Sequence, residues 1–513
     1  MNKFIKRFGI KLLLATIIMS SFSGCSSNKG ADPATKPETK KALSEVKLKM
    51  YILGDKPKDA DVVYGKMNEI MKEKINATID VNFISWGDQK TKYPLLFSSG
   101  EDFDLVFTAT GWCYYNQMAT RNGFLELTPE LLQKYAPESW KNEPKIGWEQ
   151  AKVNNKIYMI PSDKDEYGYE VVGIRGDLRE KYNIPPIKSV TDLEKYYDAV
   201  VKNEKNIVPV TNGGLQSLRV PLEEFAAGIK GVNGTSTTDP IIAYKIDDTS
   251  SKIVSVIDTP NYKNYAVKMK EYADKGYWSK SSISSKETSI DGFKGGKAAS
   301  MVWNLEQVSS AVKAMNIAHP EWKGEVVDIL PGSKKFMNPY TNNGMGINVN
   351  SKNSERALMA LDLLRYDRDI YDLTFYGIKG THYEAVGDTQ YKTLSDTANF
   401  PAEGVCPWGW TTSIGRTEVD RPKVIEQFTS KWAKEDVVHN PLETFTFNDS
   451  SVKNELAAIN TVVTQYGLPL NLGLIADPVK GVEIYSQKLK SAGLEKVMKE
   501  VQTQADVFLK AMK

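Results

Sequence analysis

The sequence predicts an α/β protein built from two lobes, and three observations support this class. The chain has 513 residues, which exceeds the size at which a single hydrophobic core usually stops growing. Strand-like and helix-like segments alternate three times between residues 47 and 122, a pattern typical of a parallel sheet covered by helices. Polar and aromatic residues follow the expected strands directly, where open α/β sheets place their ligands.

The first lobe is expected to begin with a strand at Lys47–Leu53, where apolar and polar residues alternate. Apolar side chains recur at helical spacing over Asp59–Ile75, and Ala77–Ile84 is the next expected strand. A helix over Lys90–Ser99 and a third strand over Asp104–Thr108 continue the alternation. Because a helix separates each pair of strands, the strands are expected to be parallel.

The second lobe is expected to follow two joining strands, Ile157–Pro161 and Glu170–Ile174. Its predicted elements are a helix at Asp192–Lys202, a strand at Ile207–Val210, a helix near Leu222–Gly228, a hairpin of Ile241–Ile246 with Ile253–Ile257, and helices at Tyr262–Lys275 and Lys286–Phe293. The remainder of the chain is rich in helices, with amphipathic patterns at Ser354–Tyr366, Val452–Gln465 and Val482–Ala511.

The stretch Phe293–Gln307 is the centre of this organisation. It contains a glycine turn, a strand of small residues at Ala298–Val302, and then Trp303 and Asn304 where a new helix begins. An aromatic ring at the end of a strand is a platform for a flat ligand face.

Strands at Glu325–Leu330 and Gly344–Val349 are expected to cross back to the first lobe. We therefore expect lobe 1 to comprise residues 45–162 and 326–375, and lobe 2 to comprise residues 163–325 and 376–513. The segments that cross between the lobes are expected near 160–175, 325–330 and 370–380.

The N-terminus is typical of an exported protein. Basic residues precede the apolar run Leu12–Met19, and small residues follow it, so residues 1–24 are expected to be a signal peptide, too short for a stable membrane span. The ending Phe22–Cys25 resembles a bacterial lipobox, in which Cys25 is diacylated and becomes the mature N-terminus; a plain signal peptide with an incidental cysteine is the alternative. Residues 25–44 would then be a flexible tether from a lipid anchor in the cell membrane.

The net charge and the number of cysteines limit the partners and the covalent links that the chain could have. The formal net charge is +2, and the N-terminal basic residues account for the excess, which argues against a nucleic-acid partner. With Cys25 lipidated, only Cys113 and Cys406 remain. These two cysteines could form a disulfide or stay as free thiols, and the sequence leaves both possibilities open.

Several motifs resemble those of extracellular solute-binding proteins of the maltose-binding kind. Gly296–Trp303, Gly344–Asn348 and Ser351–Leu358 stand in the order of that family's signature, and Ser98–Phe107 is similar to its first-lobe motif. Segments further along the chain are similar to the LipO/LplA group of Gram-positive lipoproteins. These segments are Glu355–Gly380, Val452–Leu470 and Lys488–Gln504.

The resemblance implies a periplasmic-binding-protein-like type II fold with two lobes, a hinge and an interlobe cleft. It also implies a monomer on the extracellular face of the membrane that delivers an oligosaccharide to the permease subunits of an ABC transporter. Asp55 and Lys56 stand where that family touches sugar hydroxyls, and Gln216 and Arg219 follow a glycine turn near a place where the family has binding residues.

Aromatic residues at element ends are the main candidates for ligand contact, because the CH-rich faces of sugars stack on indole rings. Trp303 ranks first, Trp112 second and the pair Trp408 and Trp410 third; half-buried packing is the alternative for each. The further aromatic candidates are Trp86 and Tyr114. The polar candidates are Asp55, Lys56, Asp88, Gln216, Arg219, Asn304 and Asn342, for each of which a surface charge or a helix cap is the alternative.

Catalytic patterns are sparse. The three histidines are isolated, and neither a G-x-S-x-G motif nor a phosphate loop is present, so we expect no enzymatic activity, metal or cofactor. Two functions from other classes remain as alternatives. One is a secreted polysaccharide-degrading enzyme, since a pair of carboxylates would suffice for glycoside hydrolysis. The other is an accessory sensor that passes ligand occupancy to a membrane kinase.

Overall fold

The computed structural model describes residues 43–211, 218–235, 239–284, 289–401, 405, 407–435, 437–438 and 440–511. The chain divides into two units, Met1–Leu43 and Ser44–Lys513, and the following description concerns the second. The predicted signal peptide, Cys25 and nearly all of the tether lie outside the described residues. Within the described ranges, no helix combines the length and the apolar character needed to cross a membrane.

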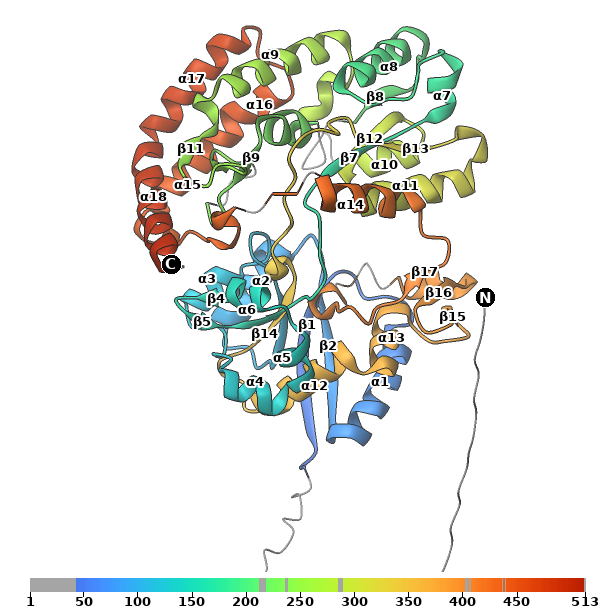
Figure 1. Ribbon diagram of the computed structural model, residues 1–513, viewed down its shortest axis with the longest axis vertical. Coiled ribbons are helices and arrows are strands. Elements are labelled where there is room, and N and C mark those ends of the chain that lie inside the picture. The colour runs from blue at the N-terminus through green and yellow to red at the C-terminus, as the bar shows by residue number, and fades with distance from the viewer. Residues whose placement is uncertain are drawn as a thin grey trace, which may run out of the picture. The chain divides into compact units, whose positions relative to one another are not determined.

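The first lobe is built around a five-stranded sheet with the order β2-β1-β3-β14-β6 (Figure 1). Strand β1 is parallel to β2 and β3, and β14 is antiparallel to both β3 and β6. The bounds of the strands are β1 Val46–Leu53, β2 Ala77–Ile84, β3 Leu105–Thr108, β6 Met159–Pro161 and β14 Gly344–Ile347. The three predicted parallel strands are therefore confirmed.

Helices pack on this sheet through the apolar faces that their sequences predict. In helix α1, the buried residues include Val63, Met67 and Met71, which recur at helical spacing. They share one hydrophobic core with Leu48 and Met50 of β1. The other main helices of this lobe are α2 Gln89–Ser98, α12 Ser354–Tyr366 and α13 Arg368–Tyr376.

The second lobe contains a four-stranded sheet with the order β13-β7-β12-β8. Strand β12 is antiparallel to β7 and parallel to β8. The bounds are β7 Glu170–Ile174, β8 Val208–Val210, β12 Ala298–Asn304 and β13 Glu325–Val327. Three further strands form a separate antiparallel sheet: β9 Ile229–Gly231, β10 Ile242–Lys245 and β11 Ile253–Ser255. The main helices around these sheets are α8 Val190–Asn203, α9 Pro260–Lys275 and α11 Leu305–Ala318.

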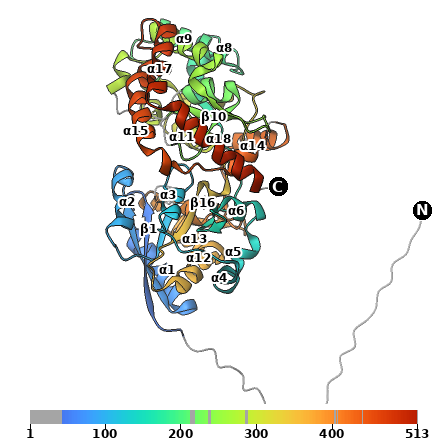
Figure 2. The same cartoon turned by 90° about the vertical axis from the view of Figure 1, so that its left-hand side faces the viewer.

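The C-terminal helices complete the second lobe. Helix α17 lies along α9, and α18 lies beside α15 and β11 (Figures 1 and 2). Their buried side chains, including Tyr485, Val497 and Val501, belong to the same core as the strands β9–β11. The bounds are α14 Lys423–Glu435, α15 Lys453–Val462, α17 Pro478–Ser491 and α18 Leu494–Ala511.

The predicted lobe boundaries differ from the packing in two places. Strand β13 pairs with β7, so the start of the segment 326–375 lies in the second lobe. Residues 376–418, predicted for the second lobe, pack on the first: Phe400 and Trp410 belong to the first core, and His382 contacts Asp59. A local apolar pattern predicts that a segment is buried, but it carries no information about which of two sheets buries it.

The third crossing segment is therefore not at 370–380, which includes helix α13 of the first lobe. Strand β17 (Thr417–Glu418) pairs with β16 (Gln390–Thr393), whereas α14 packs on α11 of the second lobe. The chain consequently crosses between Glu418 and Lys423. The Lys313 ammonium of α11 lies 2.8 Å from the Glu418 carboxylate and 2.9 Å from that of Asp420, which ties this crossing to the second lobe.

The other two crossings are paired with each other. Residues 162–169 join β6 to β7, and residues 328–343 join β13 to β14. Tyr167 and Met337 form an antiparallel bridge between them. The Glu166 carboxylate accepts hydrogen bonds from the Nδ2 atoms of Asn342 (2.8 Å) and Asn343 (3.0 Å). These crossings leave the first sheet at the edge where β1, β2 and β3 end, because β14 begins there and runs antiparallel to β3.

Candidate functional site

Three tryptophans come together at that edge of the first sheet, and we call Trp86, Trp112 and Trp408 the tryptophan cluster. The ring of Trp86 stacks on Trp408 at a centroid distance of 6.1 Å and lies 6.4 Å from the ring of Trp112. Trp86 is 42% exposed and Trp112 36%, while Trp408 is half-buried. The cluster thus presents several indole surfaces to solvent at the carboxyl ends of parallel strands, where α/β folds place their ligands.

Trp112 is held by contacts from three sides. Its Nε1–H donates to the carbonyl of Asn342 at 2.9 Å, and its ring packs on Phe107 with centroids 5.2 Å apart. Its own carbonyl accepts from Gln89 Nε2 at 3.0 Å. Because the indole N–H is already used, Trp112 offers a ligand its ring face.

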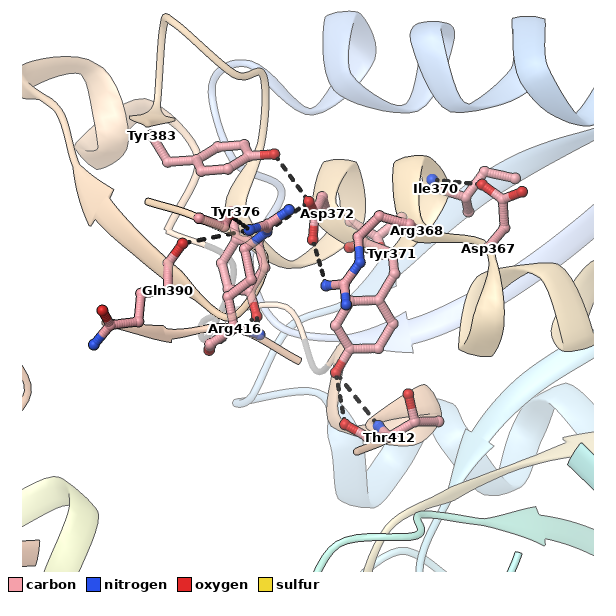
Figure 3. Close-up of polar contacts among 12 residues, drawn as sticks. Asp367, Arg368, Ile370, Tyr371, Asp372, Tyr376, Tyr383, Gln390, Thr412 and Arg416 are labelled. Carbon is pink, nitrogen blue, oxygen red and sulfur yellow. Dashed lines mark hydrogen bonds and ion pairs between the residues drawn. The ribbon is translucent and has the colours of Figure 1, made fainter. Parts of the chain in front are cut away.

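Trp408 is positioned by the residues that follow it in the chain. Trp410 Nε1 donates to Thr374 Oγ1 of α13 at 3.0 Å. Thr412 is held by the hydroxyl of Tyr371, which donates to its carbonyl and accepts from its N–H, both at 3.3 Å (Figure 3). The turn Pro407–Trp410 also packs closely on β14: a Cβ at Gly409 would lie 2.6 Å from Met345 Sδ.

An ion-pair network attaches residues 383–416, which include Trp408, to helix α13. Figure 3 shows Asp372 of α13 between Arg368, Tyr383 and Arg416. Arg416 Nε donates to Asp372 Oδ2 at 2.7 Å, and the Tyr383 hydroxyl donates to the same oxygen at 3.3 Å. Tyr383 and Arg416 lie before and after Trp408 in the chain, and both bind Asp372 of α13. The network therefore holds both ends of the segment that carries Trp408 against α13.

Trp410 was predicted as a ligand contact together with Trp408, and this prediction is wrong. Trp410 is fully buried in the first core, with its indole N–H bonded to Thr374. It anchors the turn, whereas Trp408 presents a ring surface. Trp408 and Trp410 stand two residues apart in the turn Pro407–Trp410, and the sequence alone does not show which of the two rings is buried.

The polar candidates of the first lobe lie at the expected edge, with different degrees of availability. Asp55 is exposed, and Lys56 is exposed with its ammonium 2.7 Å from the Asp61 carboxylate. Asp88 accepts from Lys92 at 2.8 Å and from Ser85 at 3.0 Å, and these hydrogen bonds lower its pKa. The half-buried Tyr114 stacks on Tyr93, with centroids 5.6 Å apart. Asn342 donates to Glu166, so its amide braces the crossing segments.

In the second lobe, Trp303 is a half-buried residue at the end of β12 that packs against the core containing Met301 and Leu305. No aromatic stacking partner of Trp303 is found among the described residues, so its role as a ligand platform stays a prediction. Asn304 is the N-cap of α11: its Oδ1 accepts from the Gln307 N–H at 3.0 Å, as in the capping alternative.

Arg219 does not form part of an exposed rim as predicted. Its guanidinium lies inside the second lobe, 2.8 Å from Glu224, 3.1 Å from Asp239 and 3.4 Å from Glu223, with only 11% of the side chain exposed. Glu223 and Glu224 follow Arg219 within five residues, but the sequence alone does not show that these carboxylates and Asp239 lie inside the lobe with it. Gln216 lies outside the described residues.

Two glutamates near the crossings were missed by the sequence reasoning. Glu166 braces Asn342 and Asn343, and burial raises its pKa although the amides oppose this effect. Glu170 lies opposite Asn304 in the pairing of β7 with β12. Part of Glu170 is exposed, but its Oε2 atom is enclosed and has no hydrogen-bond partner within the described part of the chain. Neither residue has a sequence signal, because both resemble ordinary surface charges beside a strand.

Burial raises the pKa of Glu170 to about 8, with the charge of Arg219 opposing the shift. A carboxyl whose pKa is higher in the folded state than in the unfolded state stabilises the fold at low pH, and this contribution is lost as pH rises toward 8. We therefore expect the free energy of unfolding of Glu170→Gln, relative to that of the wild type, to increase by on the order of 2 kcal/mol when the pH is raised from 5 to 8. Urea unfolding at both pH values measures this difference, with the exposed Glu384→Gln as control. An equal difference at the two pH values would contradict it.

Of the two cysteines for which a disulfide or free thiols were expected, Cys113 is a free thiol in the structure. This thiol is buried, and burial raises its pKa to about 12. Cys406 lies outside the described residues. Within the described ranges, no group of three or more His, Cys, Asp or Glu side chains is arranged to hold a metal ion.

Comparison with known proteins finds a family model that matches part of the chain and a relative that matches nearly all of it. A family model described as "Domain of unknown function (DUF3502)" matches residues 441–510. A carbohydrate ABC transporter substrate-binding protein of Streptococcus pneumoniae serotype 4 is 26% identical over 504 residues, which cover 95% of this chain and 94% of that protein.

Solved structures share the fold. The N-glycan transport solute binding protein NgtS from Streptococcus pneumoniae matches with a TM-score of 0.74 at 23% identity, covering 92% of this chain and 100% of that one. Its complex with Man5GlcNAc has a TM-score of 0.68 at 23% identity, with coverage of 92% and 100%. The alginate-binding protein AlgQ2 has a TM-score of 0.65 at 16% identity, with coverage of 91% and 100%. The chain therefore has the two-lobed α/β fold of solute-binding proteins, as the sequence predicted.

Proposed function

We propose that this protein is the solute-binding component of an ABC importer and that it captures an oligosaccharide for delivery to membrane permease subunits. The observation that carries the proposal is the tryptophan cluster, in which three indoles from distant parts of the chain meet at the strand ends of the first sheet. Indole faces stack on the apolar faces of sugar rings, and the exposed Asp55, which follows the neighbouring strand β1, would supply a carboxylate for sugar hydroxyls.

The relatives support a carbohydrate ligand. The S. pneumoniae relative is described as a carbohydrate ABC transporter substrate-binding protein, and related structures are described in complex with Man1GlcNAc, Man5GlcNAc and kestose. The resemblance of the C-terminal segments to the LipO/LplA group supports a place among Gram-positive lipoproteins, and residues 441–510 match a family model whose own function is unknown.

The proposed cycle uses the two crossing segments that pair through Tyr167 and Met337 as a hinge. Ligand on the tryptophan cluster would favour a closed arrangement of the lobes through contacts that the open arrangement lacks, and the permease would distinguish the two. We further propose that the mature chain is a monomer with no enzymatic activity, held at the outer face of the cell membrane by a lipid on Cys25.

Calorimetric titration of the mature protein against a glycan panel tests the proposal. The panel contains mannose-rich N-glycan fragments, fructo-oligosaccharides and alginate oligosaccharides, with peptides as the comparison. Saturable binding of one glycan class without release of shorter products is the expected result. Binding of peptides alone would overturn the carbohydrate assignment, and turnover of a bound glycan would favour the polysaccharide-degrading alternative.

Mass spectrometry of the membrane fraction tests the anchor. A diacylated N-terminal peptide beginning at Cys25, absent in Cys25→Ala, is expected. An unmodified peptide that begins at another residue would contradict the lipid anchor.

A further inference from the structure

Residues 441–510, which match a family model described as a domain of unknown function, pair with a short loop whose Asn233 lies close to Gly111, the residue before Trp112. We propose that Asn233 in this loop binds hydroxyl groups of the sugar unit that stacks on Trp112, and that the C-terminal region holds Asn233 in place. The inference rests on the proposed carbohydrate function and adds a binding residue from the second lobe.

The position of Asn233 is the first argument. A Cβ built on Gly111, the residue before Trp112, would lie 3.5 Å from Asn233 Oδ1. The side-chain amide of Asn233 therefore comes close to the backbone that carries the Trp112 ring. Gly111 has φ +87, a backbone conformation that favours glycine at this turn.

The availability of the amide is the second argument. Asn233 is half-buried, and no hydrogen-bond partner of its side chain is found among the described residues. A carboxamide offers both donors and acceptors, so it can bind two neighbouring hydroxyls of a sugar at once. Trp112 supplies the apolar face for the same sugar unit, because its N–H is already bonded to Asn342.

The third argument is the attachment of the loop to the C-terminal region. The backbone of Asn233 forms a parallel bridge with Thr446, and the Phe447 N–H donates to the Asn233 carbonyl at 2.9 Å. Gly234 has φ +89, and a Cβ there would lie 2.4 Å from the Phe447 carbonyl oxygen. Only glycine therefore allows the two backbones to approach this closely.

Helix α18 fixes the other side of this segment. Gln504 accepts from the Asn448 N–H at 2.9 Å and donates to the Asn448 carbonyl at 3.0 Å. The rings of Phe445 and Phe508 pack with centroids 5.5 Å apart. A continuous set of contacts thus runs from α18 through residues 445–448 to Asn233 and the Gly111–Trp112 turn. This gives the C-terminal region a defined task, which is to set the position of a ligand-binding amide.

Titration of the glycan that binds most tightly in the panel tests the role of Asn233. Asn233→Ala is expected to bind that glycan about 5- to 20-fold more weakly, which is the loss expected when hydrogen bonds between uncharged groups are removed. Asn203→Ala, whose amide bonds only within α8, is the control and is expected to bind as the wild type does. A double-mutant cycle with Trp112→Ala is expected to show coupling, because both residues contact one sugar unit.

The outcomes separate the two proposals. If the wild type binds no glycan, the proposed function fails and this inference fails with it. If Trp86→Ala weakens binding while Asn233→Ala binds within twofold of the wild type, only the role of Asn233 is overturned. Additive losses in the cycle would overturn its placement beside Trp112.

A glycine pair tests the role of the C-terminal region without truncating the chain. Gly234→Ala must displace the loop from Phe447, whereas Gly276→Ala has a similar positive φ of 80 with nothing within 4 Å of the new Cβ. Both variants are expected to lose some thermal stability, but only Gly234→Ala is expected to weaken glycan binding, by about 5-fold or more. A folded Gly234→Ala protein with wild-type affinity would overturn the positioning role.

Discussion

Replacing Trp86 by alanine is expected to weaken glycan binding by about 10- to 100-fold, the largest loss among the candidate contacts. Trp86 is the central ring of the tryptophan cluster: it contacts both Trp112 and Trp408, and it is the most exposed of the three. Calorimetric titration with the glycan selected from the panel measures the loss. Trp408→Ala is expected to follow with a smaller effect, since that ring is half-buried.

Trp140 provides a matched control for this experiment. It is a half-buried tryptophan of the first lobe that packs on Trp148, outside the tryptophan cluster. Trp140→Ala is expected to lower stability but to leave glycan affinity within twofold of the wild type. Equal losses in Trp86→Ala and Trp140→Ala would mean that the affinity depends on the general integrity of the lobe, and the cluster would then not be the binding platform.

The strands and the main helices could be predicted because their patterns are local. Strand β1 alternates apolar and polar residues, and α1 repeats apolar residues at helical spacing, so both were located within one residue of their observed bounds. The parallel pairing of β1 with β2 followed from the helix between them. These are properties that a short window of sequence determines.

Assignments that depend on distant partners could not be predicted in this way. Residues 376–418 carry polar residues such as Arg416 whose partner, Asp372, lies on α13, and this pairing places the segment on the first lobe. Trp408 and Trp410 have the same local context, yet only Trp410 finds a buried acceptor in Thr374. Tertiary packing decides such cases, and the sequence contains no local trace of it.

The same distinction applies to the site. The sequence placed Trp86, Trp112 and Trp408 at element ends, and the structure brings their rings into contact. It also placed Arg219 at the rim, but three carboxylates draw this residue into the lobe. Asn233 carried no signal at all, because its importance lies in the approach of Gly111 and in the backbone of residues 446–447.

Arg365→Met is expected to destabilise the fold by about 3–5 kcal/mol at pH 8, because it removes the buried cation that binds both Glu143 and the Pro161 carbonyl. The Arg365 guanidinium is fully buried, donates to Glu143 Oε2 at 2.8 Å and to the carbonyl of Pro161 at 2.5 Å. It therefore stabilises the point where the first crossing leaves β6. Urea unfolding of the variant measures the loss of stability. Glycan titration of its folded form measures whether the altered crossing segment also changes the affinity for glycan.

The pH dependence of this loss identifies its cause. Burial raises the pKa of Glu143 to about 8, against the opposing charge of Arg365, so the folded state already favours the protonated acid as pH falls. Without Arg365 this preference increases, and the destabilisation is expected to shrink at pH 5, where Glu143 can be neutral at lower cost. The double variant Glu143→Gln with Arg365→Met is expected to recover part of the stability at pH 8, because no buried charge remains. A loss that is equal at both pH values and unchanged in the double variant would instead indicate a packing defect around Pro161.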